Sequence, residues 1–215
     1  MIGIALFGGK AYYACEIGDD SWGDFYLEDL LNAGVVSNLA NRHPGRTGRC
    51  MVFVTPDADR TLNTYLGVSS QIGPHRLEEE KIAASSYIYM EGYLLSSDAG
   101  FEACSVAQKM AHDHGTQVSL TLSDPFMVEN FRDRFERLIR GGVDLLFCNE
   151  SEAMAFTMFA SRDEASSAIA DAAAIACVTC GREGALLATG GATNLIPAVE
   201  VDAVAVEEGY RRPAV

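Results

Sequence analysis

The amino-acid sequence predicts an α/β fold, in which a mostly parallel sheet carries helices on both faces and a β-hairpin stands apart. Three observations support this prediction. Short apolar runs of strand length alternate with longer runs of helix length from residue 77 to residue 188, a rhythm typical of parallel sheets. Residues 46–66 break that rhythm, because two β-like runs there flank a polar turn. Several predicted strands end at polar residues or glycine, namely Glu91, Asp124, Asn149 and Gly181. Since ligands bind beyond the carboxyl ends of such strands, these positions predict a binding cleft.

The first third of the chain contains a strand, a helix and the hairpin. Residues 10–17 form a short β-like run, and Asp20 or Ser21 then caps a helix that ends at about Asn32. In the first hairpin strand, Cys50, Val52 and Val54 fall on one face. Both faces of that strand are largely apolar, so the hairpin is expected to cover something on each side.

The remaining elements alternate regularly. Helices are predicted at 77–84, 101–114, 130–140, 151–160 and 162–174. Strands are predicted at 87–90, 118–122, 143–148, 177–179 and 185–188, the first of them buried and the last two joined by a glycine turn.

Composition and charge narrow the function classes. The 215 residues are 48% hydrophobic and 21% charged, which describes a folded domain rather than a disordered chain. A net charge of −14 argues against nucleic acid or an anionic membrane as partner.

No apolar run is long enough to span a membrane, and the first residues lack the basic start of a signal peptide. Six cysteines, several within apolar runs, indicate reduced thiols and a cytoplasmic location. Cys177 and Cys180 form a C-x-x-C pair without a second pair, which favours packing over metal binding.

Two segments near the carboxyl ends of strands are candidate binding sites. Asn149 and Glu152 place an amide and a carboxylate after an apolar strand, and such oxygen ligands suit Mg²⁺ and its waters. Thr179, Gly181 and Gly184 lie in a strand followed by a glycine turn, where backbone N–H groups can approach a nucleotide. Structural alternatives remain open. Asn149 could be a helix cap with Glu152 a first-turn carboxylate, the glycines could form an ordinary turn, and Asp124 could mark a turn.

Five motifs occur in one order along the chain. They are Gly-Asp-Asp-x-x-Gly-Asp-Phe at 18–25, the hairpin with Thr47-Gly48, Glu91-Gly92-Tyr93-Leu94, Leu-Ser-Asp-Pro-Phe at 122–126, and Phe-Cys-Asn-Glu-Ser-Glu at 147–152, which contains Asn-x-x-Glu. A strand and glycine turn, Val-Thr-x-Gly-x-x-Gly-Ala, follows at 178–185. Together they resemble the ribokinase (PfkB) family of sugar and nucleoside kinases, and most of all its adenosine-kinase-like branch. The resemblance implies a ribokinase-like core formed by residues 1–38 and 67–215, with the hairpin at 39–66 as a lid.

The resemblance also implies roles for matching residues. Asn149 and Glu152 would organise Mg²⁺, and Thr179, Gly181 and Gly184 would line the ATP site. Glu91 would bind a hydroxyl group of the substrate, which is a sugar or nucleoside, and Cys50 and Val52 would contact the substrate from the lid. A homodimer through the lid is a further expectation.

The sequence departs from the family at its most important motif. Relatives carry an Asp-Thr-x-Gly-Ala-Gly-Asp segment whose amides hold the transferred phosphoryl group and whose Asp is the catalytic base, and no segment here matches it. Nor does any segment match their first strand or their Gly-Gly-x-x-x-Asn substrate loop. We therefore expect a chain truncated at both ends, with no catalytic base and with impaired phosphotransfer. One alternative is a non-catalytic nucleotide-binding remnant, or a partner of an intact kinase subunit. Another is a dinucleotide-binding oxidoreductase, against which the absence of G-x-G-x-x-G argues.

Overall fold

The computed structural model describes residues 1–37, 42–56, 60–190 and 192–199. Its helices are α1 (Ile2–Leu6), α2 (Ser21–Asn32), α3 (Glu79–Ala83), α4 (Asp98–His114), α5 (Pro125–Arg140), α6 (Glu150–Thr157) and α7 (Arg162–Ala170). Its strands are β1 (Arg49–Val54), β2 (Arg60–Tyr65), β3 (Tyr87–Glu91), β4 (Gln117–Thr121), β5 (Leu145–Asn149), β6 (Ile175–Thr179), β7 (Ala185–Thr189) and β8 (Ala192–Ile196). Short 3₁₀ turns are η1 (Gly67–Gln71), η2 (Pro74–Arg76), η3 (Gly92–Ser96) and η4 (Gly181–Glu183).

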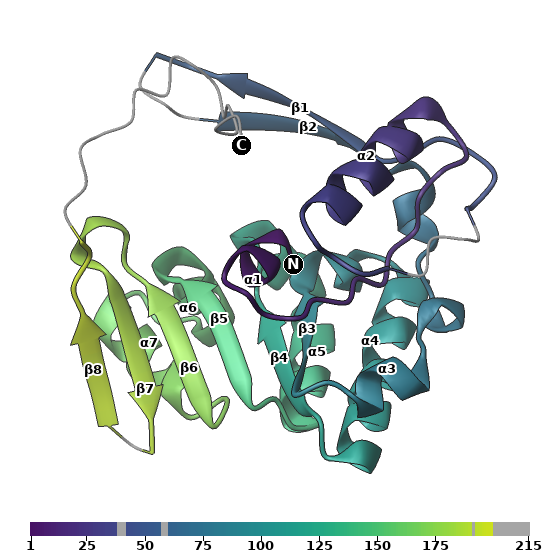
Figure 1. Ribbon diagram of the computed structural model, residues 1–215. Helices are drawn as coiled ribbons and strands as arrows, with labels where there is room; N and C mark the ends of the chain where they lie inside the picture. The colour runs from purple at the N-terminus through teal and green to yellow at the C-terminus, as the bar shows by residue number, and fades with distance from the viewer. Residues whose placement is uncertain (38–41, 57–59, 191, 200–215) are drawn as a thin grey trace.

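A six-stranded sheet in the order β3-β4-β5-β6-β7-β8 forms the centre of the fold (Figure 1). The strands from β3 to β6 are parallel, and the connections between them contain the helices α4, α5, α6 and α7. The connections from β6 to β7 and from β7 to β8 are short, so these strands pair antiparallel. The mostly parallel α/β sheet that the sequence predicts is confirmed.

The main hydrophobic core lies between this sheet and helices α4 to α7. Alternate strand residues such as Leu120, Leu146 and Val178 are buried against helix residues such as Phe135 and Ile169. On the opposite face, Tyr89 and Phe147 are partly exposed and meet edge to face, with ring centroids 6.2 Å apart. Within the described part of the chain, the helices of this core cover one face of the sheet.

Residues 1–36 form a second, smaller apolar cluster. Its buried members are Ala11, Ile17, Leu30 and Val35, and α1 packs against them. Asp20 caps α2 by accepting a hydrogen bond from the Gly23 N–H at 3.0 Å, as the sequence predicts. The same carboxylate accepts hydrogen bonds from the Thr47 N–H and hydroxyl, and Thr47 precedes β1. This contact ties the base of the hairpin to α2.

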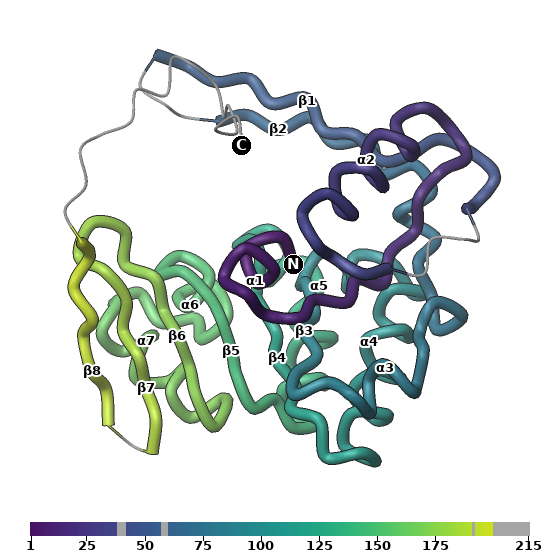
Figure 2. Tube along the Cα trace, viewed as in Figure 1, coloured from purple at the N-terminus to yellow at the C-terminus, as the bar shows by residue number. Residues whose placement is uncertain are grey.

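Strands β1 and β2 pair antiparallel, with Cys50 opposite Thr64 and Val52 opposite Leu62. They form a two-stranded sheet separate from the six-stranded one, on the side of the molecule toward which β3 to β6 point (Figures 1 and 2). Every residue of the two strands is exposed, including Met51, Val52, Phe53 and Val54. The predicted hairpin is therefore present, and within the described residues both of its faces are open.

Four predictions for individual elements differ from the structure. Residues 10–17 form no strand, only isolated bridges from Tyr12 to Val36 and from Gly18 to His43. Strand β3 is largely exposed rather than buried, because it lies at an edge of the sheet. Helix α5 begins at Pro125, since Asp124 caps it and proline suits the first helical position. Strand β8 was not predicted.

Two further observations complete the fold. None of the helices in the described part of the chain is long and apolar enough to cross a membrane. The Pro-x-x-x-Val-x-x-Val sequence at 197–204, which is similar to a strand of the ribokinase-like kinases, lies largely outside the described residues.

Candidate functional site

The polar residues predicted at the strand ends form a row along one edge of the sheet. Glu91 ends β3, Asp124 follows β4, Asn149 ends β5 and Thr179 ends β6, in the spatial order of the strands. Asn149 and Thr179 are direct partners in the β5–β6 register. The edge toward which the parallel strands point therefore combines carboxylates, an amide and a hydroxyl.

Asn149 and Glu152 are held together by a capping box at the start of α6. The Glu152 N–H donates to Asn149 Oδ1 at 2.8 Å, and the Asn149 N–H donates back to Glu152 Oε2 at 3.0 Å. The Asn149 side-chain amide also donates to Glu152 Oε1 at 2.8 Å. Asn149 is therefore a helix cap and Glu152 a first-turn carboxylate, as the structural alternative states. The same contacts fix the Glu152 carboxylate at the edge of the sheet.

Several acidic groups share this edge. Burial raises the pKa of Glu152 above its usual range, and the neighbouring Asp124 carboxylate adds to the effect. Burial also raises the pKa of Tyr93, with Asp124, Glu152 and Glu91 contributing. The pKa of Tyr89 rises to about 12, mainly through burial and then through Glu91. Glu91, Asp124 and Glu152 therefore all lie within electrostatic range of the Tyr93 phenol.

The Asn149–Glu152 pair fits an outer-sphere role toward Mg²⁺ better than direct ligation. Within the described residues no three His, Cys, Asp or Glu side chains are grouped to hold a metal ion. Each Glu152 oxygen accepts one hydrogen bond from Asn149, and Glu152 is only 6% exposed. A carboxylate oxygen can accept more than one hydrogen bond, so water bound to Mg²⁺ could still bond to it.

Ser123 joins two of the strand ends and was not among the predicted site residues. Its hydroxyl accepts a hydrogen bond from the Gly92 N–H at 2.8 Å and lies 3.4 Å from Glu91 Oε2. Its backbone is left-handed, with φ at 69°, a strained conformation for serine that is often found at functional sites. Asp124, the next residue, accepts a hydrogen bond from the Phe126 N–H and caps α5.

Thr179, Gly181 and Gly184 lie on the far side of Asn149 from Glu91. Gly181 and Gly184 both have positive φ, at 53° and 110°, and the Cys180 N–H donates to the Gly184 carbonyl at 2.8 Å. A Cβ at Gly184 would lie 2.0 Å from the Ile196 carbonyl oxygen of β8, so this position requires glycine. Arg162 bridges Glu150 on α6 and Glu183 in the turn, at 3.0 Å and 2.8 Å. The turn is consequently fixed against the start of the helix that carries Glu152.

Cys50 and Val52, expected on the substrate side of the lid, have different surroundings. Cys50 lines a cavity of about 270 Å³ between residues 13–17, α2 and the base of the hairpin, whereas Val52 is not among the residues that line it. Tyr13, Tyr26 and Tyr65 line the same cavity. These tyrosines were not predicted as site residues, although the Tyr12-Tyr13 pair in an extended run is a visible aromatic signal.

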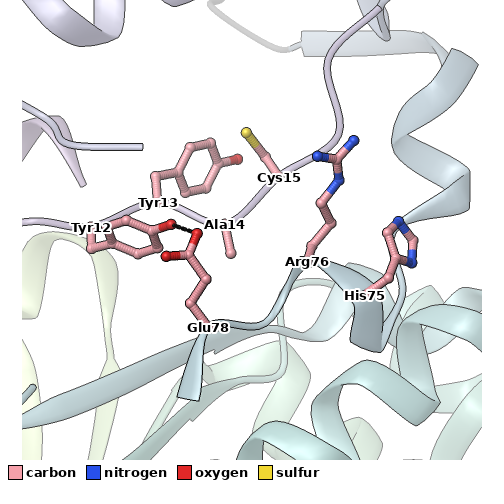
Figure 3. A pocket seen from close by; sticks show the side chains of 7 residues that line it. All are labelled: Tyr12, Tyr13, Ala14, Cys15, His75, Arg76 and Glu78. Carbon is pink, nitrogen blue, oxygen red and sulfur yellow. Dashed lines mark hydrogen bonds between the residues drawn. The ribbon is translucent and has the colours of Figure 1, made fainter. Parts of the chain in front are cut away.

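A buried ion pair lies beside this cavity. The side chain of Glu16 is fully buried, and its carboxylate accepts two hydrogen bonds from Arg76, each at 2.6 Å. The partly exposed His75 contacts the same carboxylate at 2.6 Å. Although burial opposes ionisation, the bonds from Arg76 and His75 hold the pKa of Glu16 below its usual range. Arg76 and His75 also line a smaller cavity, in which Tyr12 donates a hydrogen bond to Glu78 (Figure 3).

Comparison with known proteins assigns the fold. The pfkB family of carbohydrate kinases matches residues 1–206. The crystal structure of adenosine kinase from Sinorhizobium meliloti superposes with a TM-score of 0.90 at 34% identity, covering 94% of this chain and 63% of that one. A probable sugar kinase from Rhizobium etli gives 0.91 at 35% identity, covering 95% and 62%. Adenosine kinase of Saccharomyces cerevisiae is 27% identical over 153 residues, which are 70% of this chain and 44% of the yeast protein. The chain thus spans less than two thirds of each of these relatives.

Proposed function

Because the chain belongs to the pfkB family of carbohydrate kinases, we propose that its fold serves the transfer of the ATP γ-phosphoryl group to a hydroxymethyl group of a sugar or nucleoside. The row of residues from Glu91 to Gly181 carries this proposal. It puts a carboxylate suited to a substrate hydroxyl at one end of the sheet edge and a glycine turn suited to a nucleotide at the other.

The proposed roles follow the order of the strands. Glu91 accepts a hydrogen bond from a substrate hydroxyl, and Cys50 and Val52 approach the substrate from the hairpin. Thr179, Gly181 and Gly184 line the nucleotide. Asn149 and Glu152, between them, hold water molecules of Mg²⁺, which when bound neutralises charge on the phosphates.

Catalysis by this polypeptide is proposed to be weak. Phosphoryl transfer needs a base for the attacking hydroxyl and amides for the transferred group, and these 215 residues contain no Gly-Ala-Gly-Asp segment to supply them. Lack of a catalytic base costs about 10²- to 10⁴-fold in rate. Lack of one anion-hole donor costs roughly another 10²- to 10³-fold. The 215 residues would then bind nucleotide with little turnover.

A non-catalytic role is the second candidate, and the hairpin favours it. Its apolar residues, among them Met51 and Phe53, are exposed on both faces, as expected of a surface that meets another subunit. The partner would be a second copy of this chain or an intact kinase subunit.

We also propose a cytoplasmic location, because ATP and the six free thiols suit that compartment.

Calorimetric titration with ATP, with and without Mg²⁺, tests the proposal. An assay of ADP release against a panel of sugars and nucleosides accompanies it. Magnesium-dependent binding with little turnover is the expected result. Rapid turnover would show that another acid replaces the missing base, and absence of ATP binding would refute the proposed function. Co-purification of an intact kinase subunit would favour the second candidate.

A further inference from the structure

Ser123 occupies the turn between the end of β4 and the start of α5. The Asp124 N–H donates to the Leu122 carbonyl at 2.9 Å, so Ser123 is the central residue of a three-residue γ-turn. Its φ of 69° makes this the rare and strained form of that turn. Glycine adopts a positive φ readily, whereas serine holds its Cβ there under strain. What serine provides at this position and glycine does not is a hydroxyl group.

The Ser123 hydroxyl group links two neighbouring strands. β3 and β4 are adjacent and parallel, with Glu91 opposite Thr121 in their register (Figure 1). Ser123 Oγ accepts a hydrogen bond from the Gly92 N–H at 2.8 Å and donates to Glu91 Oε2 at 3.4 Å. The N–H group can only donate and the carboxylate can only accept, so the serine proton is directed toward Glu91. The three groups therefore form one hydrogen-bonded chain from the backbone to the carboxylate.

The position of Ser123 is fixed by its neighbours, whereas that of Glu91 is not. The Tyr93 phenol donates to the Ser123 carbonyl at 3.3 Å, and the Leu122 N–H donates to the Phe147 carbonyl of β5 at 3.0 Å. Ser123 is half-buried, but Glu91 is exposed at the end of an edge strand. An exposed glutamate side chain has many rotamers, and a hydrogen bond from a fixed group restricts them.

We propose that Ser123 is a positioning residue, which holds the Glu91 carboxylate in the orientation that accepts a hydroxyl group of the acceptor substrate. Tyr89 also interacts with this carboxylate but belongs to the same strand, so Ser123 supplies the connection to β4. The strained turn serves this role, because it directs the serine side chain toward β3. The inference rests on the proposed function, in which Glu91 binds the acceptor.

A matched pair of substitutions separates the hydroxyl group from the strain. Ser123→Ala removes the hydroxyl group and keeps the strained Cβ, whereas Ser123→Gly removes both. Both variants leave the Gly92 N–H without its serine acceptor, so Ser123→Gly should unfold at higher urea concentration than Ser123→Ala. The two variants should nevertheless weaken acceptor binding equally, by about tenfold, the scale of one hydrogen bond to a charged group.

Calorimetric titration of the 215-residue chain with ribose, fructose, adenosine and guanosine measures acceptor binding, and Mg²⁺-ATP is titrated separately. Glu91→Ala is the reference and should weaken binding of the acceptor that the parent binds by about tenfold or more. When Glu91→Ala is already present, Ser123→Gly should have no more than about a twofold further effect, because it acts through the same carboxylate.

Ser97→Ala is the matched control. Ser97 also accepts a hydrogen bond from a glycine N–H, that of Gly100 at 3.0 Å, but it caps α4. Its loss should lower stability and leave acceptor affinity unchanged. Mg²⁺-ATP affinity should be unchanged in every one of these variants.

The possible failures are distinguishable. Unchanged acceptor affinity in both Ser123 variants, losses that follow the difference in their stability, or additive losses in the double variant would each overturn the inference and leave the proposed function standing. Unchanged acceptor affinity in Glu91→Ala would overturn the role of Glu91 together with the inference. Binding of Mg²⁺-ATP without any acceptor would overturn the inference alone. Absence of binding by every acceptor and by Mg²⁺-ATP would overturn the proposed function as well.

Discussion

Glu152 combines a structural and a proposed chemical role that one substitution can separate. Glutamine is also a good partner in a capping box, so Glu152→Gln should remove the charge and keep the hydrogen bond from the Asn149 N–H, while the bond from the Asn149 side-chain amide is lost because glutamine has one acceptor oxygen. Because burial raises the pKa of Glu152, ionisation of this group lowers stability near neutral pH, and the amide relieves that cost. Removal of the charge stabilises the variant and loss of one hydrogen bond destabilises it, so its free energy of unfolding should stay within about 1 kcal/mol of that of the parent. Its Mg²⁺-dependent gain in ATP affinity should fall by about 10- to 100-fold, as for other groups that orient metal-bound water.

Calorimetry and urea unfolding of the same samples check both parts of this prediction. Glu80→Gln is the control, since Glu80 is an exposed carboxylate on α3. Retention of the full Mg²⁺ effect in Glu152→Gln would leave the residue as a helix cap alone. Loss of stability together with binding would mean that the two roles cannot be separated.

The buried Glu16–Arg76 pair predicts a dependence of stability on pH. Arg76→Met leaves a buried carboxylate without its main partner, and such losses cost about 3–5 kcal/mol of unfolding free energy. In the parent the pKa of Glu16 is below its usual 4.5, so its stabilising effect is present above that pH and is lost as the pH falls through the lower folded value. In the variant the carboxyl should protonate readily on acidification, so the difference between the two proteins should shrink from about pH 7 to about pH 4. Urea midpoints at both pH values measure it. A constant difference would contradict the assignment.

The residues of the candidate site differ in how far the sequence predicts them. Asn149 and Glu152 could be predicted from the sequence, because they are three residues apart and the end of one strand and the start of one helix bring them together. Tyr13, Tyr26 and Tyr65 could not, because they meet only when an extended segment, a helix and a hairpin strand converge. Ser123 was hidden for another reason, since a left-handed backbone at serine leaves no mark in composition or periodicity.

Among the helices and strands, features determined by neighbouring residues, such as helix ends, were predicted from the sequence. Features that depend on pairing between distant strands were not. The α4 helix stops at Gly115, which adopts the left-handed conformation that a glycine cap provides. Residues 10–17 have the composition of a strand, but among the described residues they find only isolated bridging partners, and strands need partners. β8 was missed because its residues are all exposed and show no buried alternation.

The turn between β6 and β7 allows a matched pair of glycine substitutions. At Gly181 a Cβ meets no atom within 4 Å, so Gly181→Ala should cost only the left-handed penalty of about 1–2 kcal/mol. At Gly184 the Cβ would lie 2.0 Å from the Ile196 carbonyl oxygen and also force φ of 110° on alanine. The strain and the shift of β8 together should cost about 3 kcal/mol or more.

Thermal and urea unfolding of the two alanine variants provide the comparison. Hydrogen exchange should show lost protection in β7 and β8 for Gly184→Ala, with β3 to β5 retained. Equal costs for the two variants would mean that close approach of β8 to the turn does not stabilise this end of the sheet.

On the scale of the whole molecule, a strongly acidic chain carries an exposed apolar hairpin. By strand alternation Met51 and Phe53 share one face of β1, called the outer face here, and Cys50 and Val52 share the other. Both are more than half exposed, at 62% and 54%. The outer face therefore exposes apolar side chains that a second subunit could bury.

Association through this outer face should depend on salt. Each copy carries a net charge of −14, so two copies repel each other, and this repulsion weakens as salt screens it. The stabilisation from burying Met51 and Phe53 is not weakened by salt. Sedimentation velocity should therefore show a dimer whose fraction rises from low to high salt. Phe53→Glu should abolish it, because the new carboxylate would be buried against its symmetry mate. Phe159→Glu adds the same charge at a similarly exposed phenylalanine outside the hairpin and should leave the dimer intact. A monomer at every salt concentration, or equal dissociation by the two substitutions, would remove the hairpin as the site of association.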